Sequence, residues 1–541
     1  MQEVFDRPSG SVSSGSGWTH NERKIRASGA RLVAGPGMHM TTLRNGGLAA
    51  LGLAMLAAAA LPAMAQAPAA PAPSEARLPR VVATKHEGVF NGQKVRYTAT
   101  VAETFLNDAT GKPAAAATTI AYVRDGVKDR ARRPVMFLFN GGPGASSSPL
   151  HMSALGPYKR TPSAPGDRSG GGWVENPVSP LDAVDLVFID PVGTGFSRPF
   201  PGADGKVFYS NSGDAQAVKA VIQAWLKANG REASPRYLAG ESYGTTRAAS
   251  IVKISKDLPF DGVLLIALAG EVPGREMPYV VALPTMAAGA WHHQKIDRAG
   301  RTVDQVFAEA LQFARTDYVT ALIQGGSLPP AEKRRIAERM SALVGLPADL
   351  IEAKNLRLSK NDWMFNILKD RTLRTGLLDV TVTAPLEAGQ DGAIDDPALG
   401  VVPKRAPGAA AGPPPSPAAL GAIPSPVVGR YINEVLKYPA TEPYYGVNFS
   451  VNAAWTHERG SNPYEALGQA MRENPGMRLF WAAGYYDLTT PAYAGRYVLD
   501  QAGVPAGQLT AAYFAGPHGV YDHPENLVRF NAAVRDFVTP Q

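Results

Sequence analysis

Short apolar runs, each followed by a polar or glycine-rich stretch, recur in two separate parts of this chain. The runs are apolar at successive positions instead of alternating with polar ones, which is typical of parallel strands covered by helices on both faces. They are RPVMFLFNGG, AVDLVFIDPVG, PRYLAGES and FDGVLLIALAG, followed near the C-terminus by GMRLFWAAGYYD and LTAAYFAGPHG. Helical periodicity in DAQAVKAVIQAWLKAN and ENLVRFNAAVRDFV supplies covering helices, so the pattern predicts an α/β fold.

The N-terminal part of the predicted sheet has a different pattern. GVFNGQKVRYTATVAETF reads as a hairpin that turns at Asn91-Gly92, and TTIAYV follows as a further strand. The sheet therefore begins antiparallel. In open α/β sheets, ligands bind where loops leave the carboxyl ends of parallel strands. We expect the chemistry of this protein in the loops that follow the apolar runs.

Between residues 271 and 460 the strand pattern gives way to helical segments such as RTVDQVFAEALQFARTDYVTALIQ and AEKRRIAERMSALVG. This predicts a largely helical cap insertion that divides the core into residues 80–270 and 461–541. Within the insertion, residues 404–426 are rich in Pro and Ala, which predicts an exposed connection and not a helix or a central strand.

The residues before the core have the pattern of a leader. Residues 38–65 combine one early positive charge at Arg44, an apolar run and a small-residue site that ends at Ala65, as secretory signal peptides do. The apolar run is short for a bilayer span, so we expect cleavage, export to the periplasm or medium, and no stable membrane anchor. Residues 1–37 are expected to be a disordered extension or to precede the true start, and residues 66–79 a Pro/Ala linker.

Composition narrows the possible chemistry. The 541 residues include no cysteine, which excludes a cysteine nucleophile, thiolate zinc ligands and cysteine-ligated iron–sulfur clusters. The net charge of +7 is too small and too scattered to predict a nucleic-acid partner. His292 and His293 are adjacent and cannot both lie on one helix face, and no H-E-x-x-H motif occurs. We therefore predict no metal site and no cofactor.

Ser242 is the candidate nucleophile. It lies in the stretch Gly-Glu-Ser-Tyr-Gly at 240–244, between a predicted strand and a predicted helix, which matches the G-x-S-x-G nucleophile elbow in its required setting. The helix that begins after Ser242 would direct its positive end at developing negative charge. The alternative is an ordinary strand-to-helix turn that happens to hold a serine.

A serine nucleophile needs a histidine base and an acid that orients it, and elbow folds carry them in the order Ser, Asp or Glu, His. Of the nine histidines, only His518 and His523 follow the last predicted strands. His518 comes directly after a strand end, whereas His523 is expected at the surface or at a helix start. Asp487 follows the preceding strand and is the candidate acid. Asp522 competes with it, but lies too near His518 along the chain to orient the ring.

The glycine-rich stretch that begins at Asn140 is compatible with a phosphate cradle, an oxyanion hole or a tight turn. It contains no lysine, and Ser147 stands where the third glycine of G-x-G-x-x-G belongs, so a phosphate site is not favoured. An oxyanion hole fits better, because elbow folds take one donor from the residue after the nucleophile, here Tyr243 N–H, and another from an early glycine-rich loop.

Five motifs in this order, NGGPGASS, DPVGTGFS, GESYGTTR, GYYDLTTP and GPHGVY, resemble the serine carboxypeptidase family, peptidase family S10, in particular its bacterial members. The resemblance covers roughly residue 79 to the C-terminus. It implies an α/β-hydrolase fold, a mostly parallel central sheet flanked by helices, with a largely helical cap insertion. It also implies that Gly142 and Tyr243 form the oxyanion hole, and that Asn140, Gly141 and Glu241 bind the terminal carboxylate of a substrate.

The activity implied by this resemblance is release of C-terminal residues from peptides with a free C-terminus. Ser242 would attack with His518 as general base and Asp487 orienting it, and water would hydrolyse the acyl-enzyme. Two carboxyl groups in contact cannot both stay ionised cheaply, so Glu241 beside a bound carboxylate should hold or share a proton, which predicts best peptide hydrolysis at acidic pH. An esterase or acyltransferase on the same scaffold and a non-catalytic binding protein are the alternatives. The sequence indicates no oligomeric state.

Overall fold

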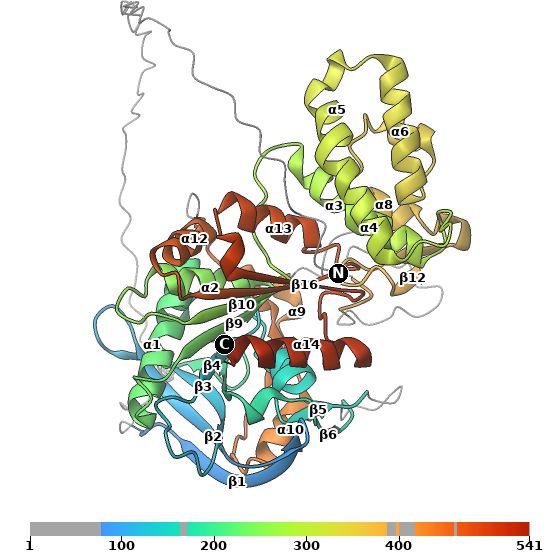
Figure 1. Cartoon of the computed structure of the whole chain (residues 1–541). Coiled ribbons are helices and arrows are strands. Elements are labelled where there is room, and N and C mark those ends of the chain that lie inside the picture. Colours follow the sequence, from blue (N-terminus) through green and yellow to red (C-terminus); the bar gives the residue numbers. More distant parts are fainter. Residues whose placement is uncertain (1–76, 163–169, 387–395, 400–416, 459–461, 540–541) are drawn as a thin grey trace, which may run out of the picture. The chain divides into compact units, whose positions relative to one another are not determined.

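A ten-stranded sheet forms the centre of the described part of the chain, in the order β1-β2-β3-β7-β4-β9-β10-β15-β16 with β8 beside β3 (Figure 1). The structure is a computed structural model that describes residues 77–162, 170–386, 396–399, 417–458 and 462–539. The strands of the sheet are β1 (Val81–Phe90), β2 (Gln93–Asn107), β3 (Pro113–Arg124), β4 (Val135–Phe139), β7 (Asp185–Asp190), β8 (Arg198–Pro199), β9 (Arg236–Glu241), β10 (Gly262–Ile266), β15 (Arg478–Gly484) and β16 (Leu509–Phe514).

The sheet is antiparallel at its N-terminal end and parallel elsewhere. β1 and β2 form a hairpin that turns at Asn91 and Gly92, both of which have positive φ. β3 pairs antiparallel with β2 and β7, whereas β7, β4, β9, β10, β15 and β16 pair in parallel along the rest of the sheet. The predicted hairpin and the predicted parallel strands are confirmed.

Helices cover both faces of the parallel strands, which explains why these strands are apolar at every position. All five residues of β4 are buried. Val135, Phe137 and Phe139 belong to the core cluster shared with α1 (Asn211–Asn229), α2 (Tyr243–Lys253), α12 (Pro463–Glu473) and α13 (Ala492–Gln501). Met136 and Leu138 belong to the cluster shared with α14 (Pro524–Val538) on the opposite face. The fold is an α/β-hydrolase fold.

The segment between β10 and α12 contains the predicted helices. They are α3 (Met277–His292), α4 (Val303–Phe313), α5 (Val319–Gln324), α6 (Pro330–Val344), α7 (Ala348–Ala353), α8 (Lys360–Asn366), α9 (Pro417–Leu420), α10 (Pro426–Glu434) and α11 (Phe449–Ala453). The same segment also holds two strand pairs, β11 (Leu373–Thr375) with β12 (Thr383–Pro385) and β13 (Ala422–Pro424) with β14 (Tyr445–Asn448). The sequence pattern predicted no strands here, because runs of three or four residues are too short to show a period.

The last part of this segment packs on the core and not on the helices α3 to α8 (Figure 1). Tyr431 of α10 is buried, its hydroxyl lies 3.0 Å from that of Tyr122 in β3, and its ring contacts Trp173. Trp173 belongs to a short hairpin, β5 (Tyr158–Arg160) with β6 (Trp173–Glu175), that follows the glycine-rich loop. The inserted segment therefore contributes to the core as well as to the cap.

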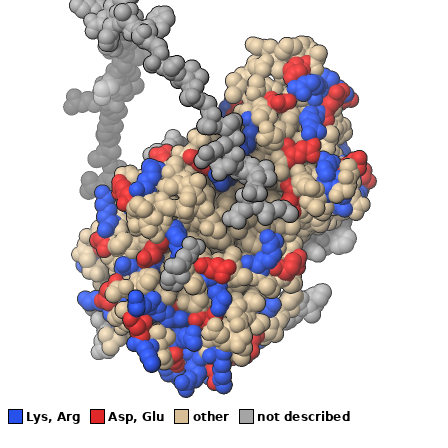
Figure 2. Space-filling view, in the orientation of Figure 1, with Lys and Arg blue, Asp and Glu red and all other residues tan. Residues whose placement is uncertain are grey.

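The remaining short helical segments are η1 (Leu150–Leu155), η2 (Pro180–Asp182), η3 (Gly205–Phe208), η4 (Ala314–Tyr318), η5 (Gly325–Ser327), η6 (Lys369–Arg371) and η8 (Ala506–Gln508). The predicted N-terminal extension, signal peptide, most of the linker and most of residues 404–426 lie outside the described residues. Within the described ranges, no helix is both long and apolar enough to cross a membrane. On the face in Figure 2, basic and acidic side chains are interspersed, in keeping with the small net charge.

Candidate active site

Ser242 lies in the sharp turn between β9 and α2. Its backbone has φ 58° and ψ −130°, a region that non-glycine residues rarely adopt. The two glycines of the motif allow this turn to close, because a Cβ at Gly240 would lie 2.1 Å from Gly244 O and one at Gly244 would lie 2.8 Å from Phe139 O. Ser242 N–H donates to Ile266 O at 2.9 Å, which ties the turn to β10. The local geometry is that of a nucleophile elbow.

Asp487 and His518 form a hydrogen-bonded pair, with 2.7 Å between Asp487 Oδ2 and His518 Nδ1. The other Asp487 oxygen accepts from the backbone N–H groups of Thr489 and Thr490 at 2.9 and 3.0 Å, and the Thr490 hydroxyl also donates to the carboxylate. Burial alone would raise the pKa of Asp487, but the contact with His518 and these hydrogen bonds hold that pKa below its ordinary value. Asp487 is thus a buried, ionised acceptor.

Because Nδ1 is bonded to Asp487, Nε2 is the His518 nitrogen that can exchange a proton with a neighbouring group. Burial would lower the pKa of His518, but the Asp487 carboxylate raises it above the ordinary value. His518 also interacts electrostatically with Glu241, the residue before Ser242. The predicted competitors are placed differently: His523 precedes the first residue of α14, and Asp522 makes no hydrogen bond to His518 within the described residues. Within the described residues, Ser242 Oγ makes no hydrogen bond to His518 or to any other group.

The glycine-rich loop after β4 lies against the first turn of α2. A Cβ at Gly141 would lie 2.3 Å from Tyr243 N, so only glycine permits this approach. Gly142 has φ +98°, which a residue with a side chain adopts only under strain. Gly142 N–H and Tyr243 N–H donate to no acceptor within the described ranges. Both donors remain available at the N-terminus of α2, where a helix favours negative charge.

Buried polar contacts fix this loop. The Arg247 guanidinium of α2 donates to Asn140 O and, through Nε, to Asp214 Oδ2 at 2.7 Å. Ser147 N–H and Oγ–H donate to Asp190 Oδ1 at 2.9 and 2.8 Å. The backbone of β14 pairs with the loop from the other side. The sequence singled out none of these supports, although Arg247 lies within the quoted motif GESYGTTR.

Glu241 is buried between the elbow and the C-terminal loop. It is 5% exposed, the Tyr521 hydroxyl donates to its carboxyl group, and the Asn140 side chain interacts with it. Burial raises the pKa of Glu241 to about 7, against the opposing effects of His518 and Tyr521. The structure therefore brings Asn140 and Glu241 together as predicted neighbours of a substrate carboxylate. Tyr521 also contacts Glu241, and the sequence pattern did not predict this contact.

A backbone segment of the insertion connects the Asp487 and His518 loops. We call residues 376–380 the strap. Leu377 O accepts from Leu488 N–H and Leu378 O accepts from His518 N–H, both at 2.8 Å. The buried Asp396 carboxylate holds the strap through Leu377 N–H at 3.0 Å and Leu378 N–H at 2.7 Å. The strap thus fixes the two loops relative to each other, and no side-chain pattern in the sequence indicated it.

The histidine pair of the insertion has structural contacts. His293 Nε2 lies 2.7 Å from Val380 O at the end of the strap, and the His292 ring packs against Tyr486. Among the described residues, no group of three or more His, Asp or Glu side chains is placed to hold a metal ion.

Comparison with known proteins shows what the chain is similar to. Residues 122–257 match the family model described as serine carboxypeptidase. Pheromone-processing carboxypeptidase KEX1 of Komagataella phaffii is 41% identical over 71 residues, which is 13% of this chain and 10% of that protein. The KEX1 protein of Ajellomyces capsulatus is 35% identical over 114 residues, 20% of this chain and 16% of that protein. The matches therefore span less than a fifth of these curated relatives.

Among solved structures, Kex1(delta)p, a prohormone-processing carboxypeptidase of Saccharomyces cerevisiae, aligns with 82% of this chain and 90% of its own at 14% identity and a TM-score of 0.48. A proline iminopeptidase of Mycobacterium smegmatis aligns with 81% of this chain and 97% of its own at 13% identity and a TM-score of 0.32.

Proposed function

We propose that the chain is a member of the serine carboxypeptidase family, whose model matches residues 122–257, and that it releases residues one at a time from the C-terminus of peptides. The matched segment carries the glycine-rich loop, Glu241 and Ser242. Asp487 and His518 come from outside it and supply the acid–base pair. The proposed substrates are peptides with a free terminal carboxylate.

The observation that carries this proposal is the buried Glu241 carboxyl group beside the nucleophile. An esterase that acts on neutral substrates has no use for an acid at this position, whereas a carboxyl group that holds a proton can donate it to a terminal carboxylate. With a pKa of about 7, raised by burial, Glu241 can hold a proton and donate it to the carboxylate of a substrate. The Asn140 side chain and Gly141 N–H would bind the same carboxylate, and Tyr521 OH orients Glu241.

In the proposed reaction, His518 Nε2 accepts the Ser242 proton while Ser242 Oγ attacks the last peptide carbonyl. Gly142 N–H and Tyr243 N–H would bind the oxyanion, and loss of one such donor typically costs about 100- to 1,000-fold in rate. The imidazolium then protonates the leaving amine, and water attacks the acyl-enzyme with His518 again as base. Asp487 holds the ring with Nδ1 protonated throughout.

The same groups predict better peptide hydrolysis on the acidic side of neutrality. Below about pH 7 Glu241 is mostly protonated and can donate to the substrate carboxylate. The groups that face Glu241 are His518, Tyr521, Asn140 and Asp522. The Glu241 carboxylate raises the pKa of His518, so protonation of Glu241 also helps His518 to stay neutral as a base. The raised pKa of His518, about 9, opposes this trend, because the imidazole must be neutral to accept the Ser242 proton.

Export is part of the proposal. Its support is the sequence of residues 38–65, with Arg44, an apolar run and a small-residue site ending at Ala65. We propose cleavage there and a periplasmic or secreted mature enzyme. N-terminal sequencing of the mature protein from the native host tests this, and a chain that retains residues 38–65 in the cytoplasm contradicts it.

The activity is tested with a mixed peptide library incubated at pH 4 to 7, with products identified by mass spectrometry. Stepwise loss of C-terminal residues is expected, and Ser242→Ala is expected to abolish it. Internal cuts, or no cuts together with intact ester hydrolysis, would instead indicate an esterase or acyltransferase on this scaffold. A protein that neither cuts nor reacts with a serine-directed fluorophosphonate would be a non-catalytic binder.

A further inference from the structure

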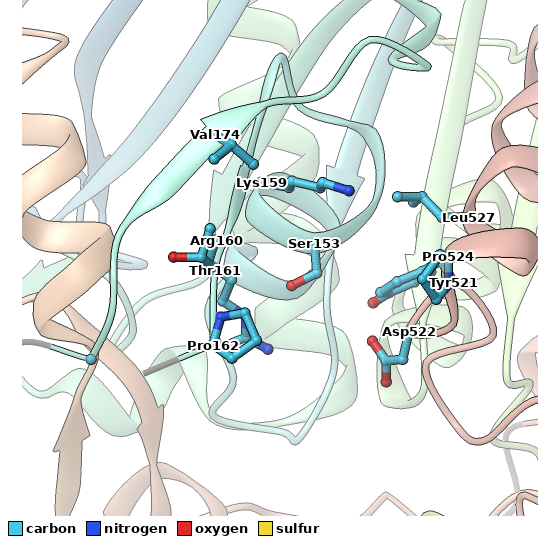
Figure 3. Close-up of a pocket in the computed structure, with 11 residues that line it drawn as sticks. Ser153, Lys159, Arg160, Thr161, Pro162, Val174, Tyr521, Asp522, Pro524 and Leu527 are labelled. Carbon is cyan, nitrogen blue, oxygen red and sulfur yellow. The ribbon is translucent and has the colours of Figure 1, made fainter. Parts of the chain in front are cut away.

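We propose that the open cleft between the β5–β6 hairpin and the start of α14 receives the side chain of the substrate's C-terminal residue, and that Lys159 makes it select acidic residues. This inference rests on the proposed carboxypeptidase function and names the substrate class for it. The cleft has a volume of about 580 Å³ (Figure 3). Lys159 and Arg160 of β5 lie on one wall, and Tyr521, Asp522 and Leu527 on the other.

The cleft lies next to the predicted carboxylate site. Tyr521 lines it, and the hydroxyl of the same residue donates to Glu241. In a C-terminal residue the side chain and the carboxylate leave the same Cα, so a pocket for one must adjoin the site for the other. A peptide whose carboxylate is bound by Glu241 would therefore have its terminal side chain beside Tyr521, at the mouth of this cleft.

The charges in the cleft do not cancel. Arg160 interacts electrostatically with Asp522 and with Tyr521, so the one acidic group on the opposite wall already faces a cation. Lys159 has no ion pair or hydrogen bond from its amino group to any residue that the structure describes. Lys159 is half-buried, and its positive charge is therefore available to pair with a ligand in the cleft.

The hairpin register separates Lys159 from the nearest carboxylate on its own element. Lys159 pairs with Val174, and Tyr158 pairs with Glu175. Lys159 and Val174 both line the cleft, whereas neither Tyr158 nor Glu175 is among the residues that line it. Glu175 therefore does not compensate the charge of Lys159.

A hydroxyl group between the two walls completes the polar lining. Ser153 lines the cleft (Figure 3), and its buried Oγ has no hydrogen-bond partner among the described residues. A glutamate or aspartate side chain would pair with Lys159 through one oxygen and accept from Ser153 through the other. An apolar side chain would leave both groups unpaired, and a basic one would meet the charge of Lys159.

The test uses N-blocked dipeptides of Phe followed by Glu, Leu or Lys, assayed at pH 6 and low salt. In the wild type, kcat/KM is expected to fall in the order Glu, Leu, Lys. Lys159→Met is expected to lower the Glu-to-Leu ratio roughly tenfold, and Lys159→Glu to invert the order of Glu and Lys. Lys128→Met removes an exposed lysine from a loop outside the cleft and serves as the matched control, with an unchanged ratio.

Two further readouts separate the possible failures. Raising the salt concentration should bring the wild-type Glu-to-Leu ratio toward that of Lys159→Met, because mobile ions screen an open ion pair. For dipeptides with Glu in the first position, Lys159→Met and Lys128→Met should change kcat/KM by the same factor, because that side chain does not enter the cleft. If the wild type cuts all three dipeptides without preference, or if Lys159→Met leaves the ratio unchanged, the cleft assignment is wrong while the carboxypeptidase function stands. If the wild type cuts none of them, the proposed function itself fails.

Discussion

Replacing Glu241 with Gln separates recognition of the terminal carboxylate from the chemistry at Ser242. Burial raises the pKa of Glu241 to about 7. At that pKa the group is about 99% protonated at pH 5 and about 10% protonated at pH 8. A bound carboxylate then faces a neutral acid at pH 5 but a second anion at pH 8. Two unit charges about 3 Å apart repel by roughly 5 kcal/mol at an effective dielectric constant near 20, so the ionised form should bind hardly at all.

The assay is the KM of a dipeptide with a free C-terminus between pH 5 and 9. If only protonated Glu241 binds, wild-type KM should rise about tenfold for each pH unit above 7, whereas Glu241→Gln, which has no titrating proton, should stay within about twofold. The matched control is an ester substrate without a free carboxylate, for which both proteins should show the same pH dependence of KM. A parallel rise of peptide KM in both proteins would refute the reasoning, because the titrating group would then lie elsewhere.

Three further outcomes follow from the same contacts. The pKa of Glu241 is higher in the folded protein than in the unfolded chain, so the folded state binds the proton more tightly. The free energy of unfolding, measured by urea titration, should therefore fall by up to about 3 kcal/mol from pH 4.5 to 7.5 in the wild type. Glu241→Gln should not show this fall. Asp487→Asn should lower kcat by roughly 1,000- to 10,000-fold with little change in KM in steady-state assays, since His518 loses the acceptor that fixes its tautomer. Asp396→Ala should lower kcat for peptides and esters alike by loosening the strap, and Asp396→Asn, which can still accept from both strap N–H groups, should restore most of it; equal losses in the two variants would contradict a positioning role.

The parts of this protein that could be predicted from sequence are those whose side chains carry a pattern. The parallel strands are apolar on both faces because α1, α2 and α14 cover them, and that requirement leaves runs such as VMFLF at 135–139. The elbow could be predicted because close backbone approach requires glycine at 240 and 244. Asp487 and His518 could be paired because the loops after β15 and β16 leave adjacent parallel strands at one edge.

The residues that hold the site in place could not be predicted from the sequence, for a physical reason. The strap acts through the carbonyl groups of Leu377 and Leu378, and any residue type offers a carbonyl group. Asp396 lies more than 80 residues from the nearest catalytic candidate in sequence, and only the fold brings its carboxylate to the strap. Tyr521 stood inside a quoted motif, but an aromatic residue after a loop is as readily a core residue as a hydrogen-bond donor, and its contact with Glu241 is evident only in three dimensions.

One buried ion pair holds the backbone that both the proposed carboxylate site and the proposed oxyanion hole use. Arg247, paired with Asp214 at 2.7 Å, donates to the carbonyl oxygen of Asn140. In a trans peptide the C=O and the following N–H point in opposite directions, so the bond to Arg247 also fixes the direction of Gly141 N–H. Gly141 N–H belongs to the proposed carboxylate site, and the next residue, Gly142, supplies a proposed oxyanion donor. Recognition of the chain terminus and stabilisation of the oxyanion therefore depend on the same anchored stretch of backbone, and a change that moves one must move the other.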